Sequence, residues 1–285
     1  MIKKVLVPTD FSANAQNAGL YALHLAQVMH FDITFLHCTQ TLVPTGKNKE
    51  AAEEGFARFR KTNEEKLRAH IDEMLKTFHG GVSISHDIKV VDTDNITETM
   101  AKIAEDAKFD LVIMGTQGAS GLKKLLVGST TAKFIEKADV PVLAVPENFT
   151  FRRPHKIGYA SDLINIDGEI QEAIKVARYF DAIVEIFHIY PVYPKVVSIA
   201  ETNPDDLVAQ MKRLYHYDKI NFHFVHTGGD NEVKKGVTLY TEAYKPDMLL
   251  MFTHKRDFID KVFDKSQTVE VATSLHVPLL ALRYE

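Results

Sequence analysis

The sequence has few of the features that mark secreted, membrane-spanning or nucleic-acid-binding proteins. Its single cysteine, Cys38, excludes a disulfide within the chain, and a reducing cytoplasm is the expected compartment. The apolar start is short and is broken by Pro8 and Asp10, which is unlike a signal peptide, and no apolar run is long enough to span a bilayer. The net charge of -4 gives no overall attraction to nucleic acid or anionic lipid. We therefore expect a cytoplasmic protein with neither nucleic acid nor membrane as a partner.

The chain is long enough for two ordinary domains, and apolar strands alternate with helical stretches along it. Its 285 residues are 45% hydrophobic and 25% charged, as in globular proteins. In the first half we expect strands near residues 5–7, 32–38, 82–91, 109–115 and 140–145, and helices near residues 12–29, 47–78, 97–108 and 129–138. Ser12 is placed to cap the first helix, and Ile103 and Ala107 are expected to face the core from the third. This alternation predicts right-handed βαβ crossovers and a parallel sheet.

The second half of the sequence repeats the first. The segment "HKIGYASD" matches "KKVLVPTD", and "HVPLLAL" matches "DVPVLAV". Residues 108–145 and 245–282 align without a gap. A repeat of this length indicates two tandem domains and not a solenoid. We place the first domain at residues 1–147 and the second at residues 154–285, separated by a polar stretch bracketed by prolines.

Polar and small residues follow the expected strands of the first domain. In parallel sheets, ligands bind beyond the carboxyl ends of the strands. Asp10 follows the first strand, Cys38 ends the second, and Gly115 ends the fourth. These three stretches are expected to meet at one edge of the sheet. Because its carboxylate only accepts hydrogen bonds, Asp10 suits a ribose hydroxyl or Mg²⁺ better than a phosphate.

Glycines and the start of a helix follow the fourth strand. Gly115 and Gly118 leave the backbone bare, which lets a ligand approach closely. Gly128 and Ser129 precede a helix whose first amides, including that of Thr130, can receive a phosphate. Taken alone, a glycine after a strand or before a helix is also common in ordinary turns and helix caps. The spacing fits neither a Walker A loop nor the dinucleotide fingerprint, whose glycines follow the first strand.

These residues resemble the universal stress protein family. The stretch "VLVPTDFS" is similar to the family's first strand and turn, and "GTQGASGLKKLLVGS" is similar to its ATP-binding signature, G-x2-G-x9-G-[ST]. The resemblance covers essentially the whole chain, as a tandem two-domain member. It implies an α/β fold with two tandem doubly wound domains, each a five-stranded parallel sheet flanked by helices, of the adenine nucleotide α-hydrolase-like type.

The resemblance also implies the ligand, which is ATP or another adenine nucleotide, with Mg²⁺ as a candidate companion. The expected nucleotide-binding residues are Pro8, Thr9, Asp10, Cys38, Met114, Gly115, Gly118, Gly128, Ser129 and Thr130. The first three would border adenine and ribose, the cysteine would offer backbone contacts to the base, and the last four would hold the phosphates. Family members pair through their last strands, which implies an intrachain pseudo-dimer of the two domains or, alternatively, a homodimer.

The second domain departs from the signature. In register, Gly115 is replaced by Phe252, and the next two glycines are replaced by Lys255 and Lys265. An aromatic ring then stands where a ligand needs bare backbone. We expect this half to keep the fold without binding ATP in the usual way, although its lysines leave a different anion open. Since the second half is expected to fold without these glycines, the first half is expected to keep them for a ligand.

Catalytic and metal-binding patterns are weak in this sequence. His223 and His226 lie on one expected strand, but no cysteine or acidic residue nearby completes a metal site, so a structural role is favoured. Ser129 has no evident histidine base, and the chain has no G-x-S-x-G elbow. We predict no catalytic residues, no metal site made of side chains and, at most, slow ATP hydrolysis.

Three hypotheses for function follow from these residues and from the resemblance, which alone implies the role in a stress response. The first is a stress-response protein that binds ATP in its N-terminal domain and acts as a nucleotide-dependent regulator or sensor. The second is a slow ATPase or a phosphoryl or adenylyl transferase, which turnover of labelled ATP would reveal. The third is a nucleotide-free scaffold that binds a protein partner, and its behaviour would not change when the glycines are replaced.

Overall fold

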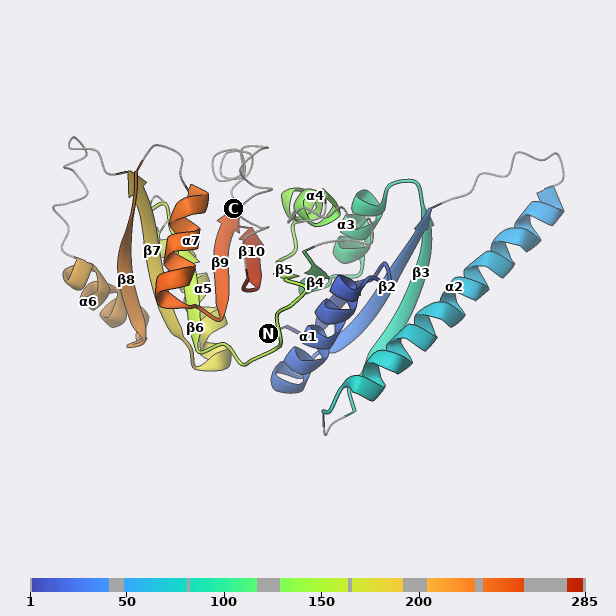
Figure 1. The fold of residues 1–285 in the computed structure, drawn as a ribbon, viewed down its shortest axis with the longest axis horizontal. Coiled ribbons are helices and arrows are strands. Elements are labelled where there is room, and N and C mark those ends of the chain that lie inside the picture. Colours follow the sequence, from blue (N-terminus) through green and yellow to red (C-terminus); the bar gives the residue numbers. More distant parts are fainter. Residues whose placement is uncertain are drawn as a thin grey trace. The chain divides into compact units, whose positions relative to one another are not determined.

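The computed structural model describes residues 2–40, 49–80, 83–116, 129–163, 166–191, 204–228, 233–253 and 276–283. The chain forms two compact units, the first running to Phe151 and the second starting at Arg152. Each unit is a parallel sheet flanked by helices, which confirms the predicted fold class (Figure 1). None of the described helices combines the length and the apolar character that crossing a lipid bilayer requires.

The first unit alternates strands and helices. Its elements are β1 (Lys4–Pro8), α1 (Ala13–Met29), β2 (Asp32–Gln40), α2 (Lys49–Thr77), β3 (His86–Thr93), α3 (Ile96–Asp106), β4 (Leu111–Gly115), α4 (Ser129–Lys137) and β5 (Val142–Val145). The strand order is β3-β2-β1-β4-β5, with parallel pairing. The chain crosses from β1 to β2 on one side and returns to β4 on the other. A topological switch point, where such sheets bind ligands, therefore lies between β1 and β4.

Local capping sets the ends of two helices in this unit. The Ser12 side chain accepts a hydrogen bond from the amide of Ala15, which confirms the expected cap of α1. Asn95 caps α3 through the amide of Glu98. One expectation for α3 was wrong, because Ala107 is exposed. The helix ends at Asp106, so Ala107 lies beyond its last turn and the buried face is formed by earlier residues.

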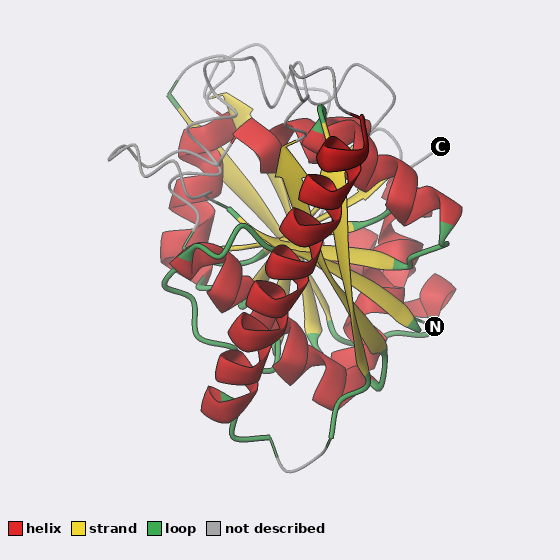
Figure 2. Ribbon diagram, turned by 90° about the vertical axis from the view of Figure 1, so that its right-hand side faces the viewer, coloured by secondary structure: helices red, strands yellow, loops and turns green. Residues whose placement is uncertain are grey.

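Helices pack against both faces of the first sheet. On one face, Met100 of α3 and Phe134 of α4 pack with Leu6, Leu36 and Val112 of the strands. On the other face, α1 packs against β4 and β5. The helix α2, which is the long helix in front in Figure 2, packs against β3. Both faces of the first sheet are therefore covered by helices.

The second unit repeats this arrangement. Its elements are β6 (Lys156–Ala160), α5 (Ile166–Phe180), β7 (Ile183–Pro191), α6 (Pro204–Tyr215), β8 (Ile220–Thr227), α7 (Val233–Tyr244), β9 (Met248–Thr253) and β10 (Leu279–Arg283). Within it the strand order is β10-β9-β6-β7-β8, again with parallel pairing.

The backbone of the second unit repeats unusual conformations of the first. Phe11, after β1, has a φ of 64°, and Leu163, after β6, has a φ of 66°. Lys108, before β4, has a φ of 52°, and Lys245, before β9, has a φ of 49°. Left-handed φ values are uncommon for residues other than glycine, so their recurrence at matching positions supports an internal duplication.

Two matching aspartates also have matching structural roles. The Asp110 carboxylate accepts hydrogen bonds from the backbone amides of Lys3 at 2.7 Å and Lys4 at 2.9 Å. Its counterpart Asp247 accepts from the backbone amides of His155 at 2.8 Å and Lys156 at 2.9 Å. Both carboxylates therefore fasten the start of the first strand of their unit, which gives a structural reason for their presence in both halves.

Candidate functional site

A cavity of about 150 Å³ opens at the carboxyl ends of β1, β2 and β4, next to the first turns of α1, α3 and α4. Its lining residues are Pro8, Thr9, Asp10, Ala15, Leu36, Cys38, Ile96, Met100, Met114, Gly115, Thr130 and Thr131. The cavity lies within the first unit, at its topological switch point. Whole sites for drug-sized ligands measure about 300–1,000 Å³, so this lining bounds a compartment for part of such a ligand.

Most of the residues expected from the sequence line this cavity. They are Pro8, Thr9, Asp10, Cys38, Met114, Gly115 and Thr130. Ser129 begins α4, next to the cavity-lining Thr130. Gly118 and Gly128 lie outside the described residues, as does the side chain of Ser129. The described part of the site therefore brings together three separate strand ends and the start of a helix.

The sequence reasoning missed the contribution of α3. Ile96, at the start of α3, and Met100, one turn later, form an apolar part of the lining. Met100 is 1% exposed, whereas Ile96 is 38% exposed. Ile96 follows the third strand as Asp10 follows the first, so the strand-end rule would have found it. The buried Thr131 was also missed, although it lies within the first turn of the expected helix.

Hydrogen bonds hold each residue of the turn between β1 and α1, which comprises residues 9–12. Thr9 donates its amide to the carbonyl of Leu36 at 2.8 Å and accepts at its hydroxyl from the amide of Phe11 at 3.1 Å. Asp10 accepts at Oδ1 from the amide of Ser12 at 3.0 Å, and its side chain is exposed at the cavity. The turn therefore presents a fixed carboxylate at the cavity mouth.

His37 holds this turn from β2. Its Nδ1 lies 2.8 Å from the carbonyl oxygen of Thr9, so Nδ1 carries the proton and donates it. Burial lowers the pKa of His37, and the charge of Lys66 acts in the same direction, against the Thr9 hydrogen bond and the Asp10 charge. His37 is therefore a neutral donor to the backbone at neutral pH. His188 makes the same contact to the carbonyl of Ser161 in the second unit, at 2.8 Å.

Cys38 gives the cavity a neutral thiol. Burial raises the pKa of this thiol to about 11, so it stays protonated near neutral pH. The side chain also packs against the core between α3, α4 and the sheet. The residue therefore acts as a small apolar part of the wall and not as a thiolate.

Gly115 has a packing role that the sequence did not reveal. A Cβ atom at this position would lie 1.6 Å from Oδ1 of Asn14 and 3.0 Å from its carbonyl carbon. Because Asn14 is buried in α1, the close approach of α1 to β4 strongly favours a glycine at this position. The backbone of Gly115 also receives a 2.8 Å hydrogen bond from the hydroxyl of Thr131, which ties α4 to β4. The glycine therefore serves packing as well as lining the cavity.

The counterpart of Gly115 in the second unit is the buried Phe252. Its ring packs edge-on against Tyr159 of β6, with 5.5 Å between ring centres. The Tyr159 hydroxyl donates to the carboxylate of Glu169 and lies 3.1 Å from the hydroxyl oxygen of Ser161. In this unit, side chains therefore fill the position at which the first unit has bare backbone. Lys255 and Lys265 lie outside the described residues.

The two histidines of β8 have separate structural partners. His223 hydrogen-bonds the carboxylate of Glu185, and Nε2 of His226 lies 2.9 Å from the hydroxyl oxygen of Tyr190. Residues three positions apart on a strand point to opposite faces, so this pair cannot share a metal ion. Across the part of the chain that the structure describes, no cluster of three His, Cys, Asp or Glu side chains is placed to hold one.

The cavity combines an apolar wall with a polar rim. Leu36, Met100 and Met114 supply apolar surface, whereas Thr9, Asp10 and Thr130 supply polar groups. Among the described lining residues, the Asp10 side chain carries the negative charge. A carboxylate is a common ligand of Mg²⁺, so Asp10 is chemically able to contribute to a divalent-cation site. The described lining therefore suits a ligand with an apolar part and with groups that hydrogen-bond to hydroxyls or a carboxylate.

Comparison with known proteins identifies the family. The model of the universal stress protein family matches residues 1–146, a little over half of the 285 residues. Universal stress protein MJ0577 of Methanocaldococcus jannaschii is 32% identical over 158 residues, which cover 51% of this chain and 95% of the relative. MJ0531 of the same organism is 27% identical over 146 residues, which cover 51% of this chain and 82% of the relative.

A solved structure shares the fold along the whole length. The crystal structure of a universal stress protein from Archaeoglobus fulgidus superposes with a TM-score of 0.65, covers 98% of this chain and 96% of its own, and is 16% identical. At this identity the likeness shows the fold alone. The fold and the match over the first unit agree, and the chain belongs to the universal stress protein family.

Proposed function

We propose that the protein binds ATP, or another adenine nucleotide, in its N-terminal domain and acts as a nucleotide-dependent regulator or sensor in a stress response. One observation carries this proposal. The cavity at the switch point between β1 and β4 is lined by Pro8, Thr9 and Asp10 from one strand end and by Met114 and Gly115 from another.

Each part of an adenine nucleotide has a matching surface. The apolar wall formed by Leu36, Met100 and Met114, beside the neutral Cys38, suits the flat face of a base. The Asp10 carboxylate can accept from ribose hydroxyls or hold Mg²⁺. The first amides of α4, which begins at Ser129, suit the phosphates because unpaired amides and the helix dipole attract anions.

The two domains have different roles under this proposal. The first, residues 1–147, carries the nucleotide site. The second, residues 154–285, keeps the fold but does not bind ATP in the usual way, because Phe252 fills the position of Gly115 and packs on Tyr159. The cytoplasmic location and the pairing of the two domains, or of two chains, stay predictions from the sequence.

Titration calorimetry with ATP and Mg²⁺ tests the proposal. We expect saturable binding with one site per chain, lost on Gly128→Val. The matched control is Lys265→Val, which changes the same register position of the second domain and should leave binding intact. Absence of heat at millimolar ATP would overturn the proposal. Analysis of the recovered nucleotide distinguishes binding from turnover, because intact ATP supports a binding protein, whereas ADP, AMP or pyrophosphate supports the enzyme alternative.

A further inference from the structure

Phe11 has an unusual conformation next to the cavity. It directly follows Thr9 and Asp10, which line the cavity, and its φ of 64° lies in the left-handed region. Residues with a side chain seldom adopt this region unless their surroundings hold them there. The structure therefore has to supply contacts that keep Phe11 in place.

Those contacts come from two different elements. The Phe11 ring lies 4.3 Å from the ring of His37 in β2 and meets the ring of His70 in α2 edge-on at 5.3 Å, measured between ring centres. The ammonium group of Lys66, also in α2, lies 4.4 Å from the centre of the Phe11 ring. We call these four residues the Phe11 clamp. It joins the cavity turn to the long helix α2.

Both imidazoles of the clamp are neutral rings. Burial lowers the pKa of His37 and of His70, and the positive charge of Lys66 acts in the same direction on both, against the Thr9 hydrogen bond and the Asp10 charge at His37 and against the Glu73 charge at His70. His37 also donates to the carbonyl of Thr9, the residue two positions before Phe11. The clamp therefore holds the turn both through its backbone and through the Phe11 ring.

The second unit builds the same turn with a different residue. Leu163 adopts a φ of 66° at the matching position, and His188 again lies 2.8 Å from the carbonyl oxygen of Ser161. An aliphatic side chain is thus compatible with this backbone. The aromatic ring of Phe11 is therefore not required by the turn itself, and it belongs to the unit that has the cavity.

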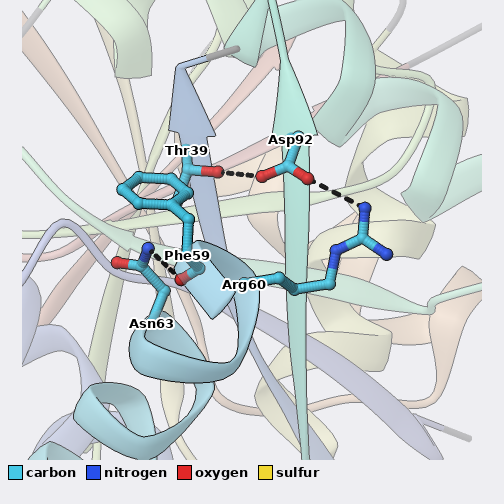
Figure 3. A network of polar contacts seen from close by, with 5 residues as sticks. All are labelled: Thr39, Phe59, Arg60, Asn63 and Asp92. Carbon is cyan, nitrogen blue, oxygen red and sulfur yellow. Dashed lines mark hydrogen bonds and ion pairs between the residues drawn. The ribbon is translucent and has the colours of Figure 1, made fainter. Parts of the chain in front are cut away.

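A second contact fastens α2 to the strand ends. Arg60 of α2 hydrogen-bonds Asp92 at 2.9 Å, and Asp92 also accepts from the hydroxyl of Thr39 (Figure 3). These two hydrogen bonds, opposed by partial burial, lower the pKa of Asp92, so its carboxylate stays ionised. The helix is therefore held at the ends of β2 and β3 as well as at the cavity turn. A shift of the Thr9 and Asp10 turn would therefore act on α2 near the place where Arg60 already attaches this helix to β3.

We propose that Phe11 is a positioning residue that fixes the Thr9 and Asp10 turn for the nucleotide and couples occupancy of the cavity to α2. This inference rests on the proposed nucleotide binding. A ligand that contacts Thr9 and Asp10 restrains Phe11, and the clamp transmits that restraint to α2 around Lys66 and His70.

Substitution by the residue of the second unit tests this role. Phe11→Leu should weaken ATP binding about tenfold, because leucine can keep the turn conformation but loses the ring pairing and the cation–π contact that restrain the turn against β2 and α2. Phe11→Tyr keeps the ring and should bind within about twofold of the original protein, since the same ring contacts remain. Leu163→Ala, at the matching position of the second unit, should leave ATP affinity unchanged. A Phe11→Leu variant that is folded by circular dichroism and binds as tightly as the original protein would overturn the proposal.

Hydrogen exchange read by mass spectrometry gives the second measurement. In the original protein ATP should slow exchange in residues 63–77 of α2, and in Phe11→Leu this slowing should disappear. Unchanged exchange of α2 in both proteins would overturn the coupling. If the original protein binds no ATP, the proposed function fails, and the clamp is tested without nucleotide. Phe11→Leu should then speed exchange in residues 9–12 and 63–77, and unchanged exchange there would refute the clamp.

Discussion

Replacing Gly115 by alanine tests the packing role of this position. The added Cβ would lie 1.6 Å from Oδ1 of Asn14, and Asn14 is 3% exposed, so the side chain has to move within a packed interior. Overpacking of this kind typically costs about 1–3 kcal/mol, and the very short contact places Gly115→Ala near the upper end, at about 3 kcal/mol. The expected destabilisation is confined to the first unit.

A double-mutant cycle with Asn14→Ala measures the clash directly. The double variant removes the contact with Oδ1 and keeps the 3.0 Å contact with the Asn14 carbonyl carbon. Its free energy of unfolding should therefore be about 1–2 kcal/mol higher than the sum of the two single effects predicts. Native-state hydrogen exchange of β4 is the assay, and about 3 kcal/mol corresponds to roughly a hundredfold faster exchange. Exchange of β9 in the second unit is the internal control. The packing argument fails if Gly115→Ala exchanges at the original rate, or if the two substitutions are additive.

Three further predictions test other parts of the structure. Burial raises the pKa of the Cys38 thiol to about 11, so its alkylation rate should rise about tenfold per pH unit from pH 7 to pH 10, and a plateau near pH 8.5 would contradict this. Burial opposes ionisation of Glu185, but hydrogen bonds from His223 and from the side-chain amide of Asn221 lower the pKa of its carboxyl below 4.5. The ionised carboxylate therefore stabilises the second unit, which should lose stability as the pH falls below 4.5. His223→Ala should cost about 1–3 kcal/mol at pH 7 and reduce this acid sensitivity, whereas an unchanged pH profile of unfolding would count against the pair. Asp110→Ala and Asp247→Ala each remove an acceptor of two amides and should each destabilise only their own unit by about 1–3 kcal/mol, as measured by hydrogen exchange.

Local sequence patterns predict much of this fold because the relevant interactions are local. Apolar runs mark the buried strands, and Ser12 caps α1 through an amide only three residues away. The exposure of Ala107 was not predicted, because periodicity does not reveal that α3 ends one residue earlier. Helix ends depend on capping and on the following chain as well as on the apolar stripe.

The candidate site was only partly predictable. Strand ends that carry Asp10, Cys38 and Gly115 meet because parallel strands align their carboxyl ends, and this topology can be inferred from the order of elements. The contact of Gly115 with Asn14 depends on how closely α1 approaches β4, for which the sequence has no signal. The Phe11 clamp likewise joins residues from three distant segments.

Photo-crosslinking with 8-azido-ATP tests the central claim most directly, because it locates the bound base on the chain. We expect saturable labelling that ATP competes away, on peptides that carry the cavity wall, namely residues 36–38, 96–100 or 114–116. The account also predicts no competed label on the matching peptides of the second unit, which include Phe252. Competed labelling centred on the second unit, or labelling that ATP does not displace, would contradict a nucleotide site between β1 and β4.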